Sequence, residues 1–160
     1  MLEGNPSCPL ELKDISKADI VCVTHGHIDH IGDSIEIVKK IDAIFIGTPG
    51  LGFFANTSGI PDEGGELCPL NIGGSVKIED IKVIMTNAVH TSDIMINEKE
   101  EVVGSGACGY VIITEDNKSI YFSGDTGVFM DMKIISDLYS PEVAIMPIGG
   151  KYTMGVSEAA

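Results

Sequence analysis

The chain of 160 residues is 44% hydrophobic and 21% charged, which predicts a soluble globular protein with a single domain over residues 1–160. Its net charge of −14, from 10 basic and 24 acidic side chains, argues against nucleic acid and anionic membranes as partners. No apolar segment approaches the ~20 residues that cross a bilayer. Because the first residues also lack the basic and apolar blocks of an export signal, we expect a cytoplasmic protein.

The first part of the chain alternates apolar runs with one amphipathic stretch. The apolar run over 19–24 predicts a buried strand, and residues 33–41 have the periodicity of an amphipathic helix. A short buried strand is expected over 43–46, followed by a turn and a short helical piece over 48–56. Residues 57–75 are rich in Gly, Pro and acidic side chains, and we expect them to form a loop.

The rest of the chain is dominated by apolar runs of strand length. Four strands are expected, over 75–78, 81–89, 106–114 and 118–123. The last two are separated by a Glu-Asp-Asn turn that indicates a hairpin. A helix is predicted over 129–138, a strand over 142–147 and the start of a helix over 156–160. Hairpins combined with strand-helix-strand units indicate an α/β protein with layered sheets flanked by helices.

A polar segment over 91–105, which contains Asn-Glu-Lys-Glu-Glu, interrupts this series of strands. Two interpretations remain open for it. It is long enough to form the rim or lid of a binding site, and it is equally compatible with a solvated hairpin tip.

The strongest chemical signal is the stretch over 24–33, which reads Thr-His-Gly-His-Ile-Asp-His-Ile-Gly-Asp. It holds three of the four histidines, His25, His27 and His30, together with Asp29. The stretch lies between a predicted strand and a predicted helix, so the backbone turns where these side chains cluster. Imidazole nitrogen and carboxylate oxygen are donors that suit zinc or a neighbouring divalent transition metal.

Two residues elsewhere could complete such a site. His90 ends a predicted strand and would join His25 and His27 as a third imidazole on one ion, leaving a coordination position open. Asp29 and His30 would face a second ion. Asp125, in a glycine-rich turn after another strand, could bridge the two ions, although aspartate is also a common turn former.

The four cysteines, at positions 8, 22, 68 and 108, form no CxxC pair. In a reducing compartment, scattered cysteines are mostly small apolar core residues. Cys22 and Cys108 lie in predicted strands and are expected to be structural. We assign no cysteine to a metal.

The motif over 24–33, the strand ending in His90, the segment Tyr-Phe-Ser-Gly-Asp-Thr-Gly-Val-Phe-Met-Asp-Met and the segment Ala-Ile-Met-Pro-Ile-Gly-Gly-Lys-Tyr-Thr-Met-Gly occur in this order along nearly the whole chain. Together they resemble the metallo-β-lactamase superfamily, in its branch of metal-dependent hydrolases close to ascorbate-phosphate lactonase-like proteins. The resemblance implies an αββα sandwich with two divalent ions at one rim, zinc first, with manganese or iron as alternatives. It implies His25, His27 and His90 on the first ion, Asp29 and His30 on the second, and Asp125 between them.

The resemblance also implies a reaction. Metal-bound hydroxide would attack an ester, lactone or phosphodiester bond of a small molecule, and the second ion or Asp29 would stabilise the leaving group. Members of this family usually begin with an additional strand hairpin and continue through another strand and helix to a late histidine. We therefore expect an incomplete sandwich. The alternative function is a non-catalytic metal-binding fragment that folds with a partner chain or as a homo-oligomer.

Overall fold

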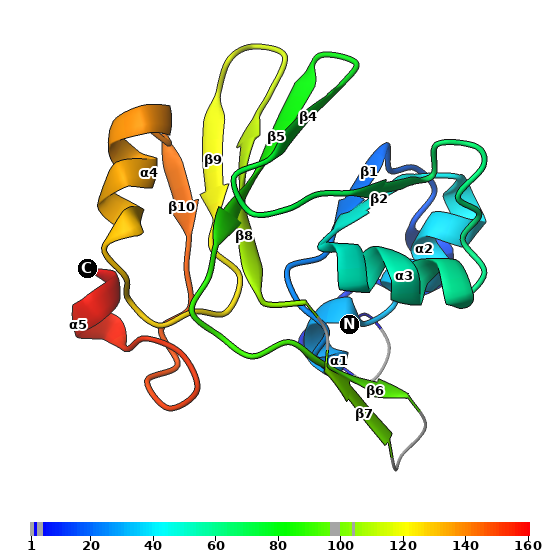
Figure 1. Ribbon diagram of the computed structural model, residues 1–160, viewed down its shortest axis with the longest axis horizontal. Coiled ribbons are helices and arrows are strands. Elements are labelled where there is room, and N and C mark those ends of the chain that lie inside the picture. The colour runs from blue at the N-terminus through cyan, green and yellow to red at the C-terminus, as the bar shows by residue number, and fades with distance from the viewer. Residues whose placement is uncertain (1, 3–4, 97–99, 104) are drawn as a thin grey trace. The chain divides into compact units, whose positions relative to one another are not determined.

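The computed structural model describes residue 2 and residues 5–96, 100–103 and 105–160, which form two compact units (Figure 1). The first unit comprises Met1–Pro69 and Ser92–Ser105, and the second comprises Leu70–Thr91 and Gly106–Ala160. Each unit has its own sheet and its own set of buried apolar residues. The mixed α/β class predicted from the sequence is confirmed, and the assignment of one domain to residues 1–160 stays a prediction.

The first unit is built on a parallel sheet with the strand order β1-β2-β3. Its strands are β1 (Ile20–Cys22), β2 (Ile44–Gly47) and β3 (Leu67–Pro69). Its helices are the 3-10 helix Leu12–Asp14, α1 (Ile28–Ile31), α2 (Ser34–Ile41) and α3 (Pro49–Thr57). An antiparallel ribbon of β6 (Asp93–Ile96) and β7 (Glu100–Val103) also belongs to this unit.

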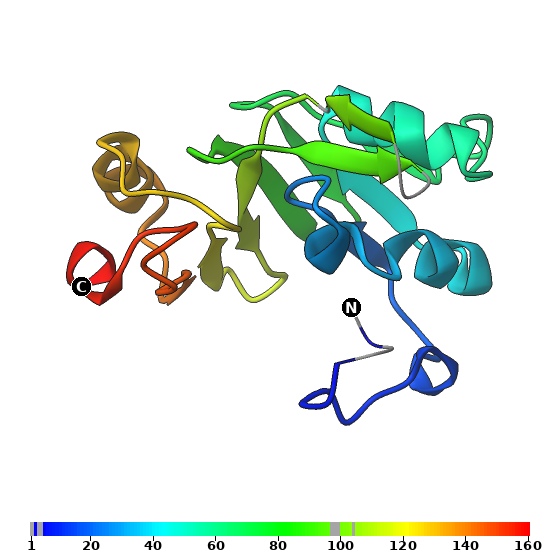
Figure 2. The same ribbon diagram turned by 90° about the horizontal axis from the view of Figure 1, so that it is seen from below.

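The apolar core of the first unit surrounds β2. Phe45 in β2 is fully buried and packs in one cluster with Val38 of α2 and with Leu51 and Ala55 of α3. Figure 2 shows α2 and α3 on either side of β2. A strand of a parallel sheet is usually covered on both faces, and this explains why β2 is an unbroken apolar run rather than an alternating one.

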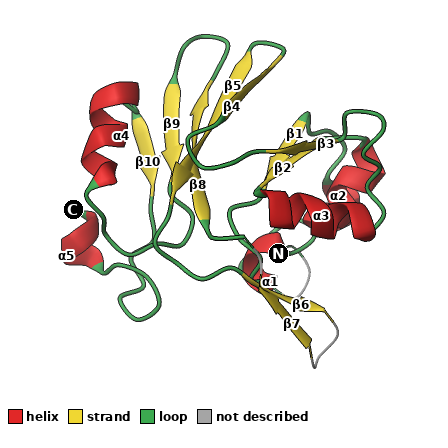
Figure 3. Cartoon of the chain, in the orientation of Figure 1, coloured by secondary structure: helices red, strands yellow, loops and turns green. Residues whose placement is uncertain are grey.

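The second unit contains a five-stranded sheet with the order β10-β9-β8-β5-β4 (Figure 3). Its strands are β4 (Ser75–Ile78), β5 (Ile81–Asn87), β8 (Cys108–Ile113), β9 (Ser119–Phe122) and β10 (Val143–Ile145). All neighbours are antiparallel except β9 and β10. The helices are α4 (Asp131–Tyr139) and α5 (Val156–Ala159), and α4 packs Ile135 against Val111 and Tyr121 of the sheet.

The direction of three strands decides where two predicted ligands lie. Both β5 and β9 pair with β8 and run antiparallel to it, so they run in the same direction. Their carboxyl ends therefore meet at one edge of the sheet, on either side of the first residues of β8. His90 follows β5 and Asp125 follows β9, and this arrangement brings both residues to the same edge.

Gly109 allows β5 and β9 to approach β8 closely at this edge. A Cβ atom at Gly109 would lie 2.8 Å from Thr86 Oγ1 in β5, and 2.9 and 3.0 Å from the carbonyl oxygens of Phe122 and Ser123. Two of these three atoms belong to backbone that is held by strand pairing. The position has no room for a side chain.

Most of the longer predicted elements are confirmed, and the differences are short elements. The turn that holds the histidines contains a helix, α1, and the expected loop over 57–75 contains β3. The segment 91–105 forms the β6–β7 ribbon, which agrees with the hairpin interpretation; residues 97–99 lie outside the described residues. The role of this segment as a rim or lid stays a prediction. Among the described residues, no helix combines the length and the apolarity needed to cross a membrane.

Gly109→Ala is expected to destabilise the second unit. Because the added methyl group has no space between β5 and β9, the free energy of unfolding should fall by about 1–3 kcal/mol, the usual cost of overpacking. Urea denaturation followed by circular dichroism measures this change.

Gly155→Ala is the matched control in the same unit. Its Cβ would meet the flexible end of Glu158 at 2.9 Å and the Gly150 Cα at 3.7 Å. The free energy of unfolding should therefore change by less than about 0.5 kcal/mol. If the free energy of unfolding of Gly109→Ala equalled that of Gly155→Ala, the space between β5 and β9 at Gly109 would not be crowded.

Cys108 is expected to be unreactive in the folded chain. Burial raises the pKa of its thiol to about 11, an effect larger than the opposing hydrogen bond with Tyr110. At pH 8 the thiol of the folded chain therefore stays protonated, and only the thiolate reacts with iodoacetamide. Mass spectrometry should find Cys108 modified only after unfolding, whereas the partly exposed Cys8 should be modified in the native chain. Equal labelling of both residues in the native chain would contradict this expectation.

Candidate metal centre

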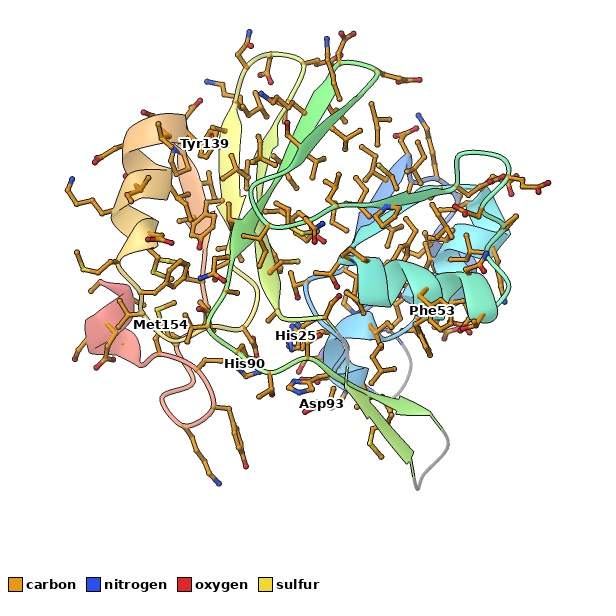
Figure 4. The ribbon with its side chains drawn as sticks, viewed as in Figure 1. His25, Phe53, His90, Asp93, Tyr139 and Met154 are labelled. Atoms are coloured by element: carbon orange, nitrogen blue, oxygen red, sulfur yellow. The ribbon has the colours of Figure 1, made fainter. Side chains whose placement is uncertain are left out.

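The first unit holds three histidine rings in contact, on the segment between β1 and α2. The ring centroids of His25 and His27 are 4.7 Å apart, and those of His25 and His30 are 4.1 Å apart. His25, which is labelled in Figure 4, is fully buried, whereas His27 and His30 are half-buried. Rings this close can direct nitrogen atoms towards the same ion or towards neighbouring ions. That His25 and His27 bind one ion and His30 a second stays a prediction.

Local hydrogen bonds explain how six consecutive residues bring three rings together. The Thr24 hydroxyl lies 3.0 Å from Nδ1 of His25 and fixes the rotation of that ring. His27 is the residue that precedes α1, and its carbonyl oxygen accepts the N–H groups of His30 and Ile31, both at 2.9 Å. His30 therefore lies one helical turn after His27, and residues three apart share a helix face.

Asp29 lies in the first turn of α1 and is the most exposed member of the cluster. Its side chain is 71% exposed, and its Oδ2 atom lies 3.6 Å from Nε2 of His30. A carboxylate in the first turn of a helix is electrostatically favourable. Asp29 and His30, the two residues predicted to face a second ion, thus lie next to each other, and their binding of an ion stays a prediction.

The peptide between His25 and His27 is held by a residue from a distant part of the sequence. The N–H of Gly26 donates a buried hydrogen bond of 3.0 Å to the Ser92 hydroxyl, 66 residues away. A Cβ atom at Gly26 would clash with Cγ1 of Ile94 and would lie 3.2 Å from the carbonyl oxygen of Asp93. Glycine is therefore required between the two histidines, because the start of β6 packs directly against this peptide.

The second unit holds the other two predicted ligands together. Nε2 of His90 lies 3.9 Å from Oδ2 of Asp125, and both side chains are mostly buried. The segments that carry them are joined by two hydrogen bonds. The N–H of Val89 donates to the Thr126 hydroxyl at 2.9 Å, and the N–H of Gly127 donates to the carbonyl oxygen of Val89 at 3.0 Å.

All six predicted ligands are thus found in two groups. His25, His27, Asp29 and His30 lie together in the first unit, and His90 and Asp125 lie together in the second. Ser92 and Thr126, which are buried and bind backbone next to the predicted ligands, are functional residues that the sequence did not predict. The signal in the sequence was their position next to predicted ligands, because Ser92 comes two residues after His90 and Thr126 comes one residue after Asp125.

The chemistry of these donors fits a divalent transition metal. The two groups offer imidazole nitrogens and carboxylate oxygens, which zinc, manganese and iron accept. That no cysteine binds a metal stays a prediction.

Comparison with known proteins identifies the family. Residues 2–160 match the family described as "Beta-lactamase superfamily domain". A metal-dependent hydrolase from Methanosphaera stadtmanae is 44% identical over 161 aligned residues, which cover 99% of this chain and 66% of that protein. A metal-dependent hydrolase from Koribacter versatilis is 40% identical, with 98% of this chain and 65% of the relative covered. The chain therefore spans about two thirds of the length of these relatives.

A solved structure supports the same assignment. The structure of a metallo hydrolase from the hyperthermophilic archaeon Ignicoccus hospitalis superposes with a TM-score of 0.76 and 33% sequence identity, covering 97% of this chain and 64% of the other. The chain belongs to the metallo-β-lactamase superfamily, and its relatives there are named metal-dependent hydrolases.

Proposed function

We propose that this chain is the metal-binding part of a hydrolase that uses two divalent ions, zinc in the first instance, to cleave an ester, lactone or phosphodiester bond in a small molecule. The observation that carries the proposal is the contact of three imidazoles within six residues, with ring centroids 4.1 and 4.7 Å from that of His25. Structural histidines have no reason to gather in this way, whereas metal ligands must.

In the proposed centre, the two ligand groups act together. His25, His27 and His90 would hold the first ion, Asp29 and His30 would hold the second, and Asp125 would bind both. Chain connectivity supports this combination, because Ser92 is hydrogen-bonded to Gly26 and lies only two residues after His90. Two residues of extended chain span at most about 7 Å.

The chain's own residues orient the ligands and the leaving group. When bound, divalent ions lower the pKa of water and polarise a carbonyl or phosphoryl oxygen. The Thr24 hydroxyl next to Nδ1 leaves Nε2 of His25 as the nitrogen that faces an ion. Asp29 is exposed enough to reach a departing oxygen and is therefore the residue proposed to stabilise the leaving group.

The overall acidity of the chain is compatible with an anionic substrate. Two divalent cations outweigh the two carboxylates proposed to bind them, so the centre itself is positive. Surface charges more than about 8 Å away are largely screened at physiological salt. The net charge of −14 still favours a small molecule over nucleic acid as the substrate. A cytoplasmic location is also part of this proposal, because four scattered cysteines without a CxxC pair are compatible with a reducing compartment.

A second candidate function is a metal-binding fragment without catalytic activity that associates with another chain or with itself. The observation that favours it is the sheet edge at β10, where all three residues are exposed, including Val143 at 51% and Ile145 at 50%. Unpaired edges with apolar side chains invite pairing with another strand.

Hydrolysis of bis(p-nitrophenyl) phosphate by the zinc-loaded chain tests the proposal. We expect turnover that stops on addition of a chelator and falls by at least about 100-fold in His27→Ala, because one of three imidazoles on the first ion is lost. Absorbance of p-nitrophenolate measures the rate, and the zinc content of each variant is measured in parallel.

Ile28→Ala is the matched control for metal content. Ile28 lies between His27 and Asp29 in sequence, is 68% exposed and offers no donor atom. Its zinc content should equal that of the native chain. A zinc-bound oligomer inert towards a panel of esters, lactones and phosphodiesters would instead support the second candidate, and native zinc content in His27→Ala would refute both.

Zinc titration should resolve two unequal ions. The first ion is proposed to have three imidazoles, whereas the second has one imidazole, Asp29 and the shared Asp125. We expect the first equivalent to bind at least about tenfold more tightly, which corresponds to about 1.4 kcal/mol. Competition with a chromophoric chelator measures both affinities. Two ions of equal affinity would rule out this division of ligands.

A further inference from the structure

Ser92 and Asp93, which follow His90 in sequence, contact Gly26 in the turn that carries the histidines. Ser92 is 5% exposed, and its hydroxyl accepts the N–H of Gly26 at 3.0 Å. The next residue, Asp93, begins β6 and places its carbonyl oxygen against Gly26. Figure 4 shows Asp93 in the neighbourhood of His25. This contact joins segments 66 residues apart within the first unit.

The N–H of Gly26 requires an acceptor, because it is buried and lies beyond the end of the strand ladder. β1 ends at Cys22, and the hydrogen bond from the N–H of Val23 to the carbonyl oxygen of Ile46 continues its pairing with β2. Leaving a buried donor unsatisfied costs about 1–3 kcal/mol. The hydroxyl of Ser92 supplies the acceptor that the sheet does not provide.

The position of β6 does not depend on this hydroxyl alone. Ile94 is 3% exposed and packs in the same apolar cluster as Val23 and Ile31, which flank the histidine turn in sequence. Apolar packing therefore anchors the strand, and the hydrogen bond has a separate effect. It fixes the orientation of the peptide between His25 and His27.

We propose that Ser92 is a positioning residue of the metal centre, which sets the separation of the His25 and His27 imidazoles by holding the Gly26 peptide. This inference rests on the proposed function, because it assumes that both rings bind one ion. Outer partners of metal ligands orient them, and their loss typically weakens metal binding or activity by 10–100-fold. Ser92 differs from the usual outer partner in binding the backbone between two ligands rather than a ring nitrogen.

The experiment compares the metal affinity and the cobalt spectrum of Ser92→Ala and Ser92→Thr with those of the native chain. Removal of the hydroxyl should weaken the first equivalent of zinc by about 10–100-fold. It should also change the d–d absorption of the Co(II) form, because the geometry of the ligands becomes less constrained. Ser92→Thr keeps the acceptor oxygen and should restore most of the affinity and the native spectrum.

Ser34→Ala is the matched control. Ser34 is also a buried serine of the first unit, in α2, and its hydroxyl makes no hydrogen bond within the described part of the chain. Its loss should leave zinc affinity and the Co(II) spectrum unchanged. Thermal unfolding of the metal-free variants shows how much of any change is a general loss of stability.

The outcomes separate the two proposals. Native zinc affinity and a native Co(II) spectrum in Ser92→Ala would overturn the role of Ser92 while leaving the proposed function intact. Equal weakening in Ser34→Ala would also overturn it, because a general loss of packing would then account for the effect. Retained zinc binding in His27→Ala would instead refute the proposed function.

Discussion

Three imidazoles taken from six consecutive residues can bind neighbouring ions only if the peptides between them are held rigidly. In the first unit, hydrogen bonds satisfy this constraint at each step of the turn. Thr24 fixes the first ring, Ser92 binds the peptide after it, and the carbonyl of His27 accepts the N–H groups that start α1. Because α1 is only four residues long, these contacts rather than helix propensity maintain its geometry.

In the second unit, a sheet holds the predicted ligands in position. Its two ligands lie just beyond the ends of β5 and β9, strands that run in the same direction on either side of β8. A buried hydroxyl next to a ligand again accepts a backbone N–H, here from Val89 to Thr126. In both units, a buried hydroxyl thus binds a backbone N–H group beside the predicted ligands, and supporting contacts of this kind hold ligands in place.

The ligands and the longer elements could be predicted from the sequence because their signals are local. The spacing of His25, His27 and His30 is visible without any fold, and the periodicity of α2 extends over two helical turns. By contrast, α1 and β3 have four and three residues, too few for a period to emerge. Ser92 was missed for a different reason: a serine reveals its acceptor role only through a partner 66 residues away.

The glycine in β8 has a further consequence for how the sheet assembles. If the pairing register of β8 shifted by one residue, every side chain of the strand would move to the other face of the sheet. A shift by two residues would return the side chains to their original faces. The two-residue shift, however, would bring Ala107 or Val111 to the crowded point between Thr86 and the Phe122 carbonyl, where a Cβ has no space. Gly109 therefore fixes the register in which β8 pairs with β5 and β9. The narrow gap that lets the strand ends converge also selects the one alignment of β8 in which His90 and Asp125 face each other.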